Sequence, residues 1–219
     1  MKKTILTLGL LASSLTHAMD TKNFHNLGFS KNQKYFAFAD SVVQDGSGFP
    51  LADVYVVNTA KNTITKHTRV MIEDDSSFDE NEALQKAIAK ADLTKNGIIA
   101  GQNLGVATPA SEQSPLRLPL TANGRDYTIE LKQLPAGTLN PNCIEDLEDQ
   151  MIEVSLESSS QKITLQKDQR QPKSRECSYD YRIDRALVNG KSLVVVLSYQ
   201  TFGFEGPDTN HMVVTGTLP

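Results

Sequence analysis

The chain has 219 residues, a formal net charge of −4, two cysteines and no tryptophan. An acidic chain lacks the concentrated positive charge with which proteins bind nucleic acids or anionic lipid surfaces, so neither kind of partner is expected. After residue 18 no apolar run approaches the ~18 residues that a spanning helix needs, so no membrane anchor is expected after signal cleavage. About 200 residues are enough for one domain with a substantial core.

Residues 1–18 have the features of a secretory signal peptide. A basic pair, Lys2 and Lys3, precedes an apolar stretch that ends in small residues at Ala18. This order of basic, apolar and small residues is typical of a segment that directs export and is then removed. We therefore expect a periplasmic or secreted protein in which residues 19–219 form a single β-rich domain.

Strand signals dominate that domain. Short stretches of alternating or β-branched apolar residues recur along the chain and are separated by turn residues. Asn189-Gly190 lies between the last two stretches and predicts a type I′ hairpin turn, because both residues tolerate positive φ. The expected strands cover residues 34–43, 52–58, 63 onward, 116–120, 127–131, 151–156, 163–165, 179–188 and 191–199.

One segment, residues 79–95, has helical periodicity instead. Its small and large apolar residues recur every three or four positions, and either Ser77 with Glu80 or Asp79 with Glu82 offers a capping box at its start. Acidic residues at this end complement the positive end of the helix dipole. They do not match a calcium loop, because Glu80 stands where that loop needs glycine.

These elements favour a mainly β fold with one amphipathic helix. The strands would form either an antiparallel β-sandwich or a small propeller-like array. A propeller of this length would have about four or five blades of ~40–45 residues, and the helix takes up the room of one blade. The sandwich is therefore slightly favoured.

Cys143 and Cys177 are expected to form a disulfide, because an exported protein with an even number of cysteines usually oxidises them. A group of basic residues lies ahead of the second cysteine, among glutamine and proline. We expect this group to be a solvated loop. Its members are Lys167, Arg170, Lys173 and Arg175.

Residues 32–58 and 189–215 resemble each other without a gap when the sequence is shifted by 157 positions. Identities fall on a turn, a strand, a loop and a second strand in the same order, and the two loops read DGSGFP and FGFEGPD. The pattern predicts one strand-loop-strand unit used at each end of the domain. Chance similarity is the alternative explanation.

Two resemblances accompany these patterns. The stretches GFSKNQKYFAF, QDGSGFP and GFEGPD resemble the signature stretches of a family of bacterial predicted secreted proteins of unknown function. That resemblance implies export and a shared fold, and it implies no known activity, cofactor or catalytic residue. The first unit also loosely resembles a blade of periplasmic TolB-like and WD40-like propellers.

No catalytic motif, cofactor motif or metal-ligand spacing occurs, and no catalytic residue or metal ligand is assigned. The two glycine-rich loops are the best candidates for a binding surface, because aromatic and acidic residues on loops between rigid strands often serve recognition. The alternative is that their phenylalanines only cap the core. The candidate residues are Asp45, Ser47, Phe49, Phe204, Glu205, Asp208 and His211.

The sequence therefore favours a non-catalytic periplasmic or secreted binding or scaffold module, with an envelope protein or a glycan as its partner. The alternative is a hydrolase or carbohydrate-active enzyme that uses the loop carboxylates. His211 would have to meet Asp45, Glu205 or Asp208 in a pocket for that alternative to gain support.

Overall fold

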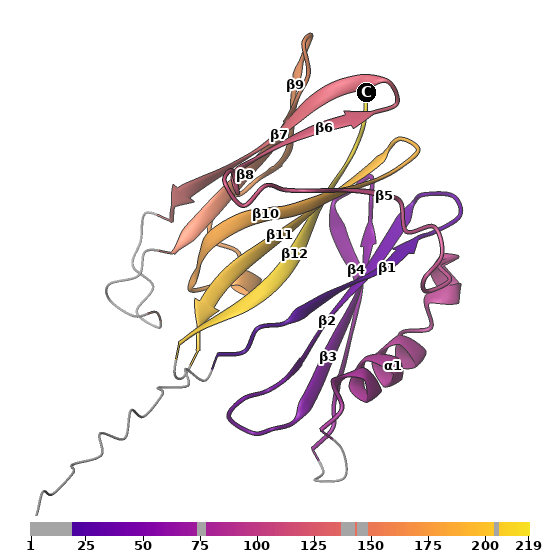
Figure 1. The fold of residues 1–219 in the computed structure, drawn as a ribbon, viewed down its shortest axis with the longest axis vertical. Coiled ribbons are helices and arrows are strands. Elements are labelled where there is room, and N and C mark those ends of the chain that lie inside the picture. The colour runs from indigo at the N-terminus through magenta and orange to yellow at the C-terminus, as the bar shows by residue number, and fades with distance from the viewer. Residues whose placement is uncertain (1–18, 74–77, 137–142, 144–148, 204–205) are drawn as a thin grey trace, which may run out of the picture.

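The computed structural model describes residues 19–73, 78–136, 143, 149–203 and 206–219, so the expected signal peptide lies outside the described residues. Within them the chain forms three four-stranded antiparallel sheets and one α-helix (Figure 1). The expectation of a mainly β fold with one helix is confirmed. No helix in the described part of the chain is both long and apolar enough to cross a membrane.

Each sheet is built from a different part of the chain. The N-terminal sheet, in the order β1-β2-β3-β4, consists of β1 (Asn23–Phe29), β2 (Tyr35–Val43), β3 (Pro50–Asn58) and β4 (Thr63–Met71). The middle sheet, in the order β12-β11-β10-β5, consists of β5 (Val106–Pro109), β10 (Ser178–Asn189), β11 (Ser192–Phe202) and β12 (Pro207–Thr217). The outer sheet, in the order β6-β7-β8-β9, consists of β6 (Arg117–Ala122), β7 (Arg125–Pro135), β8 (Gln150–Glu157) and β9 (Lys162–Lys167).

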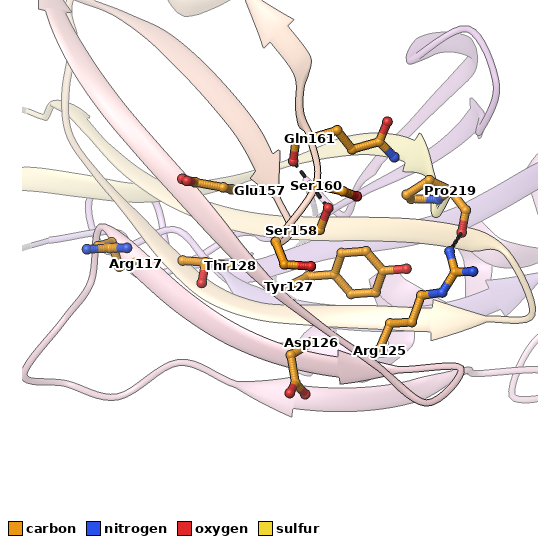
Figure 2. Close-up of a pocket in the computed structure, with 11 residues that line it drawn as sticks. Arg117, Arg125, Asp126, Tyr127, Thr128, Glu157, Ser158, Ser160, Gln161 and Pro219 are labelled. Carbon is orange, nitrogen blue, oxygen red and sulfur yellow. Dashed lines mark hydrogen bonds between the residues drawn. The ribbon is translucent and has the colours of Figure 1, made fainter.

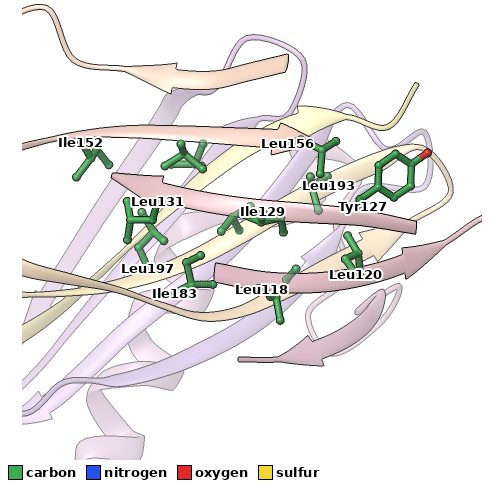
Figure 3. Packing of buried hydrophobic residues seen from close by; sticks show 14 of the residues in the cluster. Leu118, Leu120, Tyr127, Ile129, Leu131, Ile152, Leu156, Ile183, Leu193 and Leu197 are labelled. Atoms are coloured by element: carbon green, nitrogen blue, oxygen red, sulfur yellow. The ribbon is translucent and has the colours of Figure 1, made fainter. Parts of the chain in front are cut away.

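The layers pack face to face, with a hydrophobic cluster between each pair. Helix α1 (Glu80–Ala91) places Leu84 against the outward face of the N-terminal sheet. Phe36 lies between the N-terminal and middle sheets, and Leu193 and Ile129 lie between the middle and outer sheets (Figure 3). β11 is apolar throughout its centre because the middle sheet is covered on both faces. The packing is sandwich-like, and the described strands supply three sheets rather than the four or five blades of a propeller.

The helix is shorter than the expected 79–95. Asp79 is its N-cap, and the Asp79 side chain accepts a hydrogen bond from the second helical N–H. The α-helix ends at Ala91 because Asp92 adopts a left-handed conformation with φ 46°. A 3₁₀ turn, η1 (Leu93–Asn96), follows and ends at Gly97, whose φ is 67°.

The expected type I′ turn at Asn189-Gly190 is wrong by one position. Asn189 still pairs with Ser192, so the two turn residues are Gly190 and Lys191, and of these only Gly190 has positive φ. The pairing of β10 with β11 extends one residue farther than expected, to Asn189, and the turn therefore begins one residue later. The dipeptide Asn123-Gly124, which the sequence analysis did not single out, has φ of 51° and 72° and makes the type I′ turn between β6 and β7.

The two sequence units that resemble each other both form hairpins. β2 and β11 start 157 positions apart, at Tyr35 and Ser192, and β3 and β12 start at the same offset. Phe36 faces the middle sheet, and its counterpart Leu193 faces the outer sheet. The hairpins therefore lie in successive layers with the same orientation. Whether they are a true internal repeat stays a prediction.

Candidate functional site

A cleft of about 510 Å³ lies where one edge strand from each sheet meets the others. β4 contributes Thr63 and Ile64, β12 contributes Met212 and Val213, and β9 contributes Gln166. Because β12 lies between the other two sheets, its free edge runs along the cleft. The volume is in the range of pockets that hold small molecules.

The backbone of β12 has one hydrogen-bonding position that opens into this cleft. The N–H groups of His211 and Thr215 point away from β11, since they donate to Asp40 Oδ2 (3.2 Å) and Asn62 Oδ1 (2.8 Å). Alternate residues of a strand point the same way, and the pairing of β12 with β11 has no bulge. Val213 therefore directs its N–H and C=O into the cleft, where no described side chain hydrogen-bonds to them.

A ladder of four rings crosses the N-terminal sheet and leads into the cleft. Phe24, Phe38, Tyr55 and His67 stand on the four successive strands, with ring centroids 5.6, 4.8 and 4.6 Å apart in that order. Phe38 is buried, whereas the side chain of His67 is 44% exposed. The ladder thus runs from the core to the surface, and Phe38 and Tyr55 line the cleft.

Two tyrosines, one on each side of β12, present hydroxyl groups to the cleft. Tyr55 packs with the cluster between the N-terminal and middle sheets, and Tyr199 stacks on Tyr181 at 5.2 Å beside the outer sheet. Burial raises the pKa of Tyr55 and that of Tyr199, the latter to about 12, and the nearby Asp40 adds to both effects. Among the described residues neither hydroxyl has a hydrogen-bond partner, so both are available to a ligand.

A chain of hydrogen bonds joins the three sheets along one wall of the cleft. Asn62 Oδ1 accepts from Thr215, and Asn62 Nδ2 donates to Gln166 Oε1 at 2.8 Å. Gln166 Nε2 donates to Asp168 Oδ1 at 2.9 Å, and Asp168 also accepts two bonds from Arg175 Nη2. The backbone N–H of Thr215 can only donate and an ionised Asp168 can only accept, so the orientations of both amides are fixed.

Arg175 is held rigidly at the end of this chain. It lies at the end of the short 3₁₀ helix η2 (Lys173–Arg175), and its side chain is 7% exposed. Nη2 lies 2.7 Å from Asp168 Oδ2, and Nη1 donates to Tyr181 Oη at 2.9 Å. The expectation that Arg175 belongs to a solvated loop is therefore wrong: a buried carboxylate neutralises its charge, which makes its burial tolerable.

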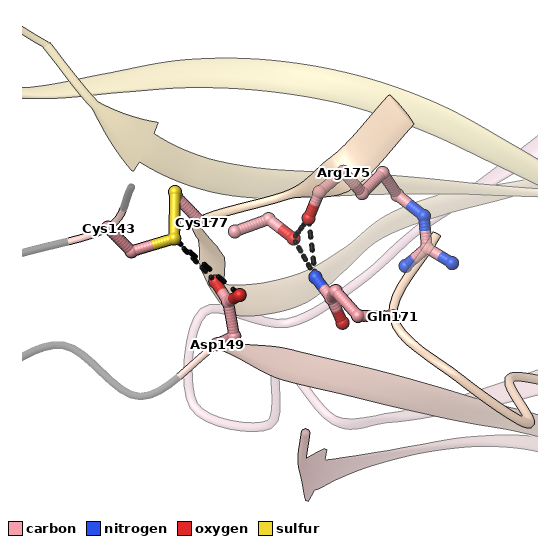
Figure 4. The surroundings of a disulfide bond; sticks show 6 residues. Cys143, Asp149, Gln171, Arg175 and Cys177 are labelled. Atoms are coloured by element: carbon pink, nitrogen blue, oxygen red, sulfur yellow. Dashed lines mark hydrogen bonds between the residues drawn. A yellow bond between two sulfur atoms is a disulfide. The ribbon is translucent and has the colours of Figure 1, made fainter. Parts of the chain in front are cut away.

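The disulfide anchors the segment that carries Arg175. Cys143 and Cys177 are bonded, as expected, and Cys177 follows Arg175 by two residues (Figure 4). The Gln171 side chain donates to the Arg175 carbonyl, which fixes the backbone on the other side of the arginine. Both carboxylate oxygens of Asp149 lie 3.6 Å from Cys143 Sγ, and burial raises the pKa of Asp149.

His211 closes the opposite end of the cleft. Its Nδ1 lies 3.0 Å from Asp40 Oδ1 on β2, and its Nε2 lies 3.8 Å from Asp184 Oδ2 on β10. The hydroxyl of Ser198 donates to Asp184 at 2.7 Å, so it is directed at a carboxylate and not at the imidazole. Burial raises the pKa of Asp184. His211 therefore ties the N-terminal sheet to the middle sheet through two acidic side chains.

Of the residues expected from the sequence, His211 is the one that lines the cleft. Asp45 and Ser47 are exposed, Phe49 is half-buried, and Ser47 Oγ bonds only within its own loop. Asp45 does not pair with His211; its N–H donates to Asp20, and Asp20 N–H donates to Asp208 Oδ1 at 3.0 Å. The two loops therefore lie at one end of the molecule, joined through Asp20. Phe204 and Glu205 lie outside the described residues.

A second cavity, of about 670 Å³, lies at the hairpin ends of the outer sheet (Figure 2). Tyr127 is in its centre, and Arg125 Nη1 donates to the Pro219 carbonyl beside it. Tyr127 is its one aromatic ring, and that hydroxyl is buried without a partner among the described residues. Small-molecule pockets combine apolar walls with a few convergent polar groups, which favours the cleft along β12 over this polar cavity.

Sequence reasoning missed most of the cleft. Tyr55 was visible only as one residue of an expected strand, and Tyr199 ended another. Asn62 was an ordinary turn residue. The available signal was the alternation of Phe36 and Phe38 in YFAF, together with the single tyrosine of DVYVV, because it indicated rings on neighbouring strands.

The sequence comparisons identify a family. No curated protein matches the chain. A family model matches residues 37–217, a span that starts in β2, ends with β12 and includes every residue that lines the cleft. That family is described as predicted secreted protein, which supports secretion of this chain. The chain belongs to the DUF2259 family of predicted secreted proteins.

Proposed function

We propose that this secreted protein is a non-catalytic binding module of the periplasm or cell exterior, in which residues 19–219 act as one domain. Its ligand lies in the cleft along β12. The observation that supports this most directly is the pair Tyr55 and Tyr199, which line the cleft and whose hydroxyls have no hydrogen-bond partner among the described residues. Neither hydroxyl oxygen is among the fully buried unpartnered atoms in the described part of the chain, so each can bond to water in the free protein and exchange that water for a ligand.

The rigidity of the walls supports a binding role. Arg175 is fixed by Asp168, Tyr181 and the neighbouring disulfide, and Asn62 is fixed by Thr215. A site whose side chains are already in place loses little conformational entropy when it binds. The loop residues Phe49 and Asp208, at the end of the molecule near Asp20, remain predicted contacts for a larger partner.

One arrangement favours an enzyme as the second candidate. His211 lies between two carboxylates, Asp40 and Asp184, as a general base with an orienting acid would. However, Ser198 donates to Asp184 and not to His211, so the histidine does not activate this nearby hydroxyl. Among the described residues neither Asp45 nor Asp208 contacts His211. The binding role is therefore the better supported of the two.

The test is capture of a small molecule from the compartment in which the protein acts. Immobilised protein is incubated with an ultrafiltered envelope extract, washed, and unfolded to release bound compounds for mass spectrometry. Wild type is compared with a Tyr55→Phe/Tyr199→Phe variant, which lacks both unpartnered hydroxyls. The matched control is Tyr127→Phe, which removes an unpartnered hydroxyl from the other cavity.

We expect wild type and Tyr127→Phe to retain the same compound, and the double variant to retain less of it. Equal retention by all three proteins would contradict the cleft as the binding site. Steady conversion of the compound into a product by wild type, abolished in His211→Gln, would contradict the non-catalytic role and favour the enzyme. Circular dichroism of each variant shows whether it is folded.

A further inference from the structure

The hydrogen-bonding groups of the cleft show which chemical class of ligand it accepts. Asn62 Oδ1, Gln166 Oε1 and both oxygens of Asp168 accept hydrogen bonds from within the protein. Each amide nitrogen carries two hydrogens, and only one hydrogen from each is used in these bonds. Asn62 Oδ1 and both Asp168 oxygens accept two bonds each, whereas Gln166 Oε1 accepts one. The wall therefore has more spare donors than spare acceptors.

Arg175 adds further donors without adding net charge. Its guanidinium has five N–H groups, of which the bonds to Asp168 and Tyr181 use only some. Asp168 balances its positive charge at 2.7 Å. An anionic ligand would therefore gain little from this arginine, whereas a neutral ligand rich in oxygen acceptors would gain hydrogen bonds.

The remaining lining is aromatic and aliphatic. Tyr55 is stacked between Phe38 and His67, and Tyr199 is stacked on Tyr181. The two tyrosines therefore contribute ring edges and hydroxyls, whereas Ile64, Met212 and Val213 offer aliphatic surface. A pyranose ring has a C–H face that packs on apolar surface, and hydroxyl oxygens around its rim. An N-acetyl substituent adds a carbonyl acceptor for the spare donors and a methyl group for the aliphatic surface.

We infer that the cleft binds a neutral N-acetylated oligosaccharide. This rests on the proposed function, since it specifies the ligand of the same cleft. The N-acetyl carbonyl accepts from the Asn62–Gln166–Arg175 wall, and the sugar ring packs against Ile64, Met212 and Val213. The hydroxyls of Tyr55 and Tyr199 bond to the ring substituents. A peptide is less suited, because the N–H groups of β12 at His211 and Thr215 are already occupied by Asp40 and Asn62, which leaves Val213 alone for strand pairing.

The test is isothermal titration of the mature protein with four soluble probes. Tri-N-acetylchitotriose has the inferred chemistry, and its de-N-acetylated trimer replaces each acetamide by an amine. Maltotriose has hydroxyls without acetamides, and an N-acetyl tripeptide amide has amide carbonyls without sugar rings. We expect tri-N-acetylchitotriose to bind about tenfold more tightly than the other three, because each lost hydrogen bond or apolar contact weakens binding.

Variants assign the binding to the cleft. Tyr55→Phe and Tyr199→Phe should each weaken tri-N-acetylchitotriose binding about three- to tenfold, and Tyr127→Phe should leave it unchanged. Equal affinity for maltotriose, or tighter binding of the tripeptide, would overturn the inferred ligand class. If all four probes fail to bind but envelope extract still yields a compound retained through Tyr55 and Tyr199, the ligand class is wrong and the binding role holds. If neither the titrations nor the extract experiment shows binding, both the inferred ligand class and the proposed binding role are wrong.

Discussion

At the scale of single residues, two stacked tyrosines have opposite surroundings. Tyr181 Oη bonds to Arg175 Nη1 at 2.9 Å and to Ser178 Oγ, whereas Tyr199 Oη has no partner among the described residues. Tyr181→Phe should lower the free energy of unfolding by about 1–3 kcal/mol, because it leaves buried polar groups unsatisfied. Tyr199→Phe should change it by less than about 0.5 kcal/mol. Urea unfolding measures both, and equal losses would contradict the assignment of Tyr199 to a ligand.

A second residue-scale prediction concerns Asp53. Burial alone would raise its pKa, but bonds from Arg69 (2.8 Å) and His67 (2.6 Å) outweigh this and the pKa is lowered. The charged pair therefore stabilises the fold above the ordinary pKa of 3.8, and this stabilisation is lost as the pH falls through the lowered value. Asp53→Asn should cost about 1–3 kcal/mol at pH 7.

The same difference should persist to about pH 5 and shrink below about pH 4, where the Asp53 carboxylate becomes protonated first in the unfolded chain and, at lower pH, in the folded protein. Urea unfolding of both proteins across this range checks the sign. A gap between wild type and variant that stays constant down to about pH 3 would show that Asp53 does not carry the pH dependence.

At the scale of elements, β1 contains a bulge that only glycine tolerates. Gly28 has φ 106°, and a Cβ there would lie 2.0 Å from the backbone oxygen of Gln102. Gly28→Ala should therefore destabilise the protein by about 3 kcal/mol or more. Gly46, in the β2–β3 loop, is the matched control: a Cβ there meets nothing within 4 Å. Gly46→Ala should change stability by less than about 1 kcal/mol, and similar midpoints in thermal unfolding for the two variants would refute the packing at Gly28.

Helices and strands could be predicted from the sequence where the local residue pattern determines them. The run of apolar residues at Leu193–Leu197 gives a strand buried on both faces, and Asp79 caps the helix as one of the two expected caps. The cleft was not predictable in this way. Its residues come from strands and turns far apart in sequence, and Arg175 looked solvated because its partner Asp168 is identified only by tertiary packing.

At the scale of the whole molecule, the disulfide closes a loop of 34 residues between β7 and β10. Replacing both Cys143 and Cys177 by alanine should lower the free energy of unfolding by up to about 4 kcal/mol, since the unfolded chain gains conformational freedom. A thiol assay on unfolded, unreduced protein should find no free thiol. Two free thiols, or unchanged stability of the double variant, would show that the bridge does not hold the Arg175 segment.

The central claim is that the three sheets meet around a ligand cleft at Tyr55 and Tyr199. The most direct test is carbon-13 NMR of protein labelled at its six tyrosine rings, titrated with the ultrafiltered envelope extract. The ring signals of Tyr55 and Tyr199 should shift, whereas that of Tyr127, in the other cavity, should not. Shifts at Tyr127 with none at Tyr55 and Tyr199 would contradict the claim.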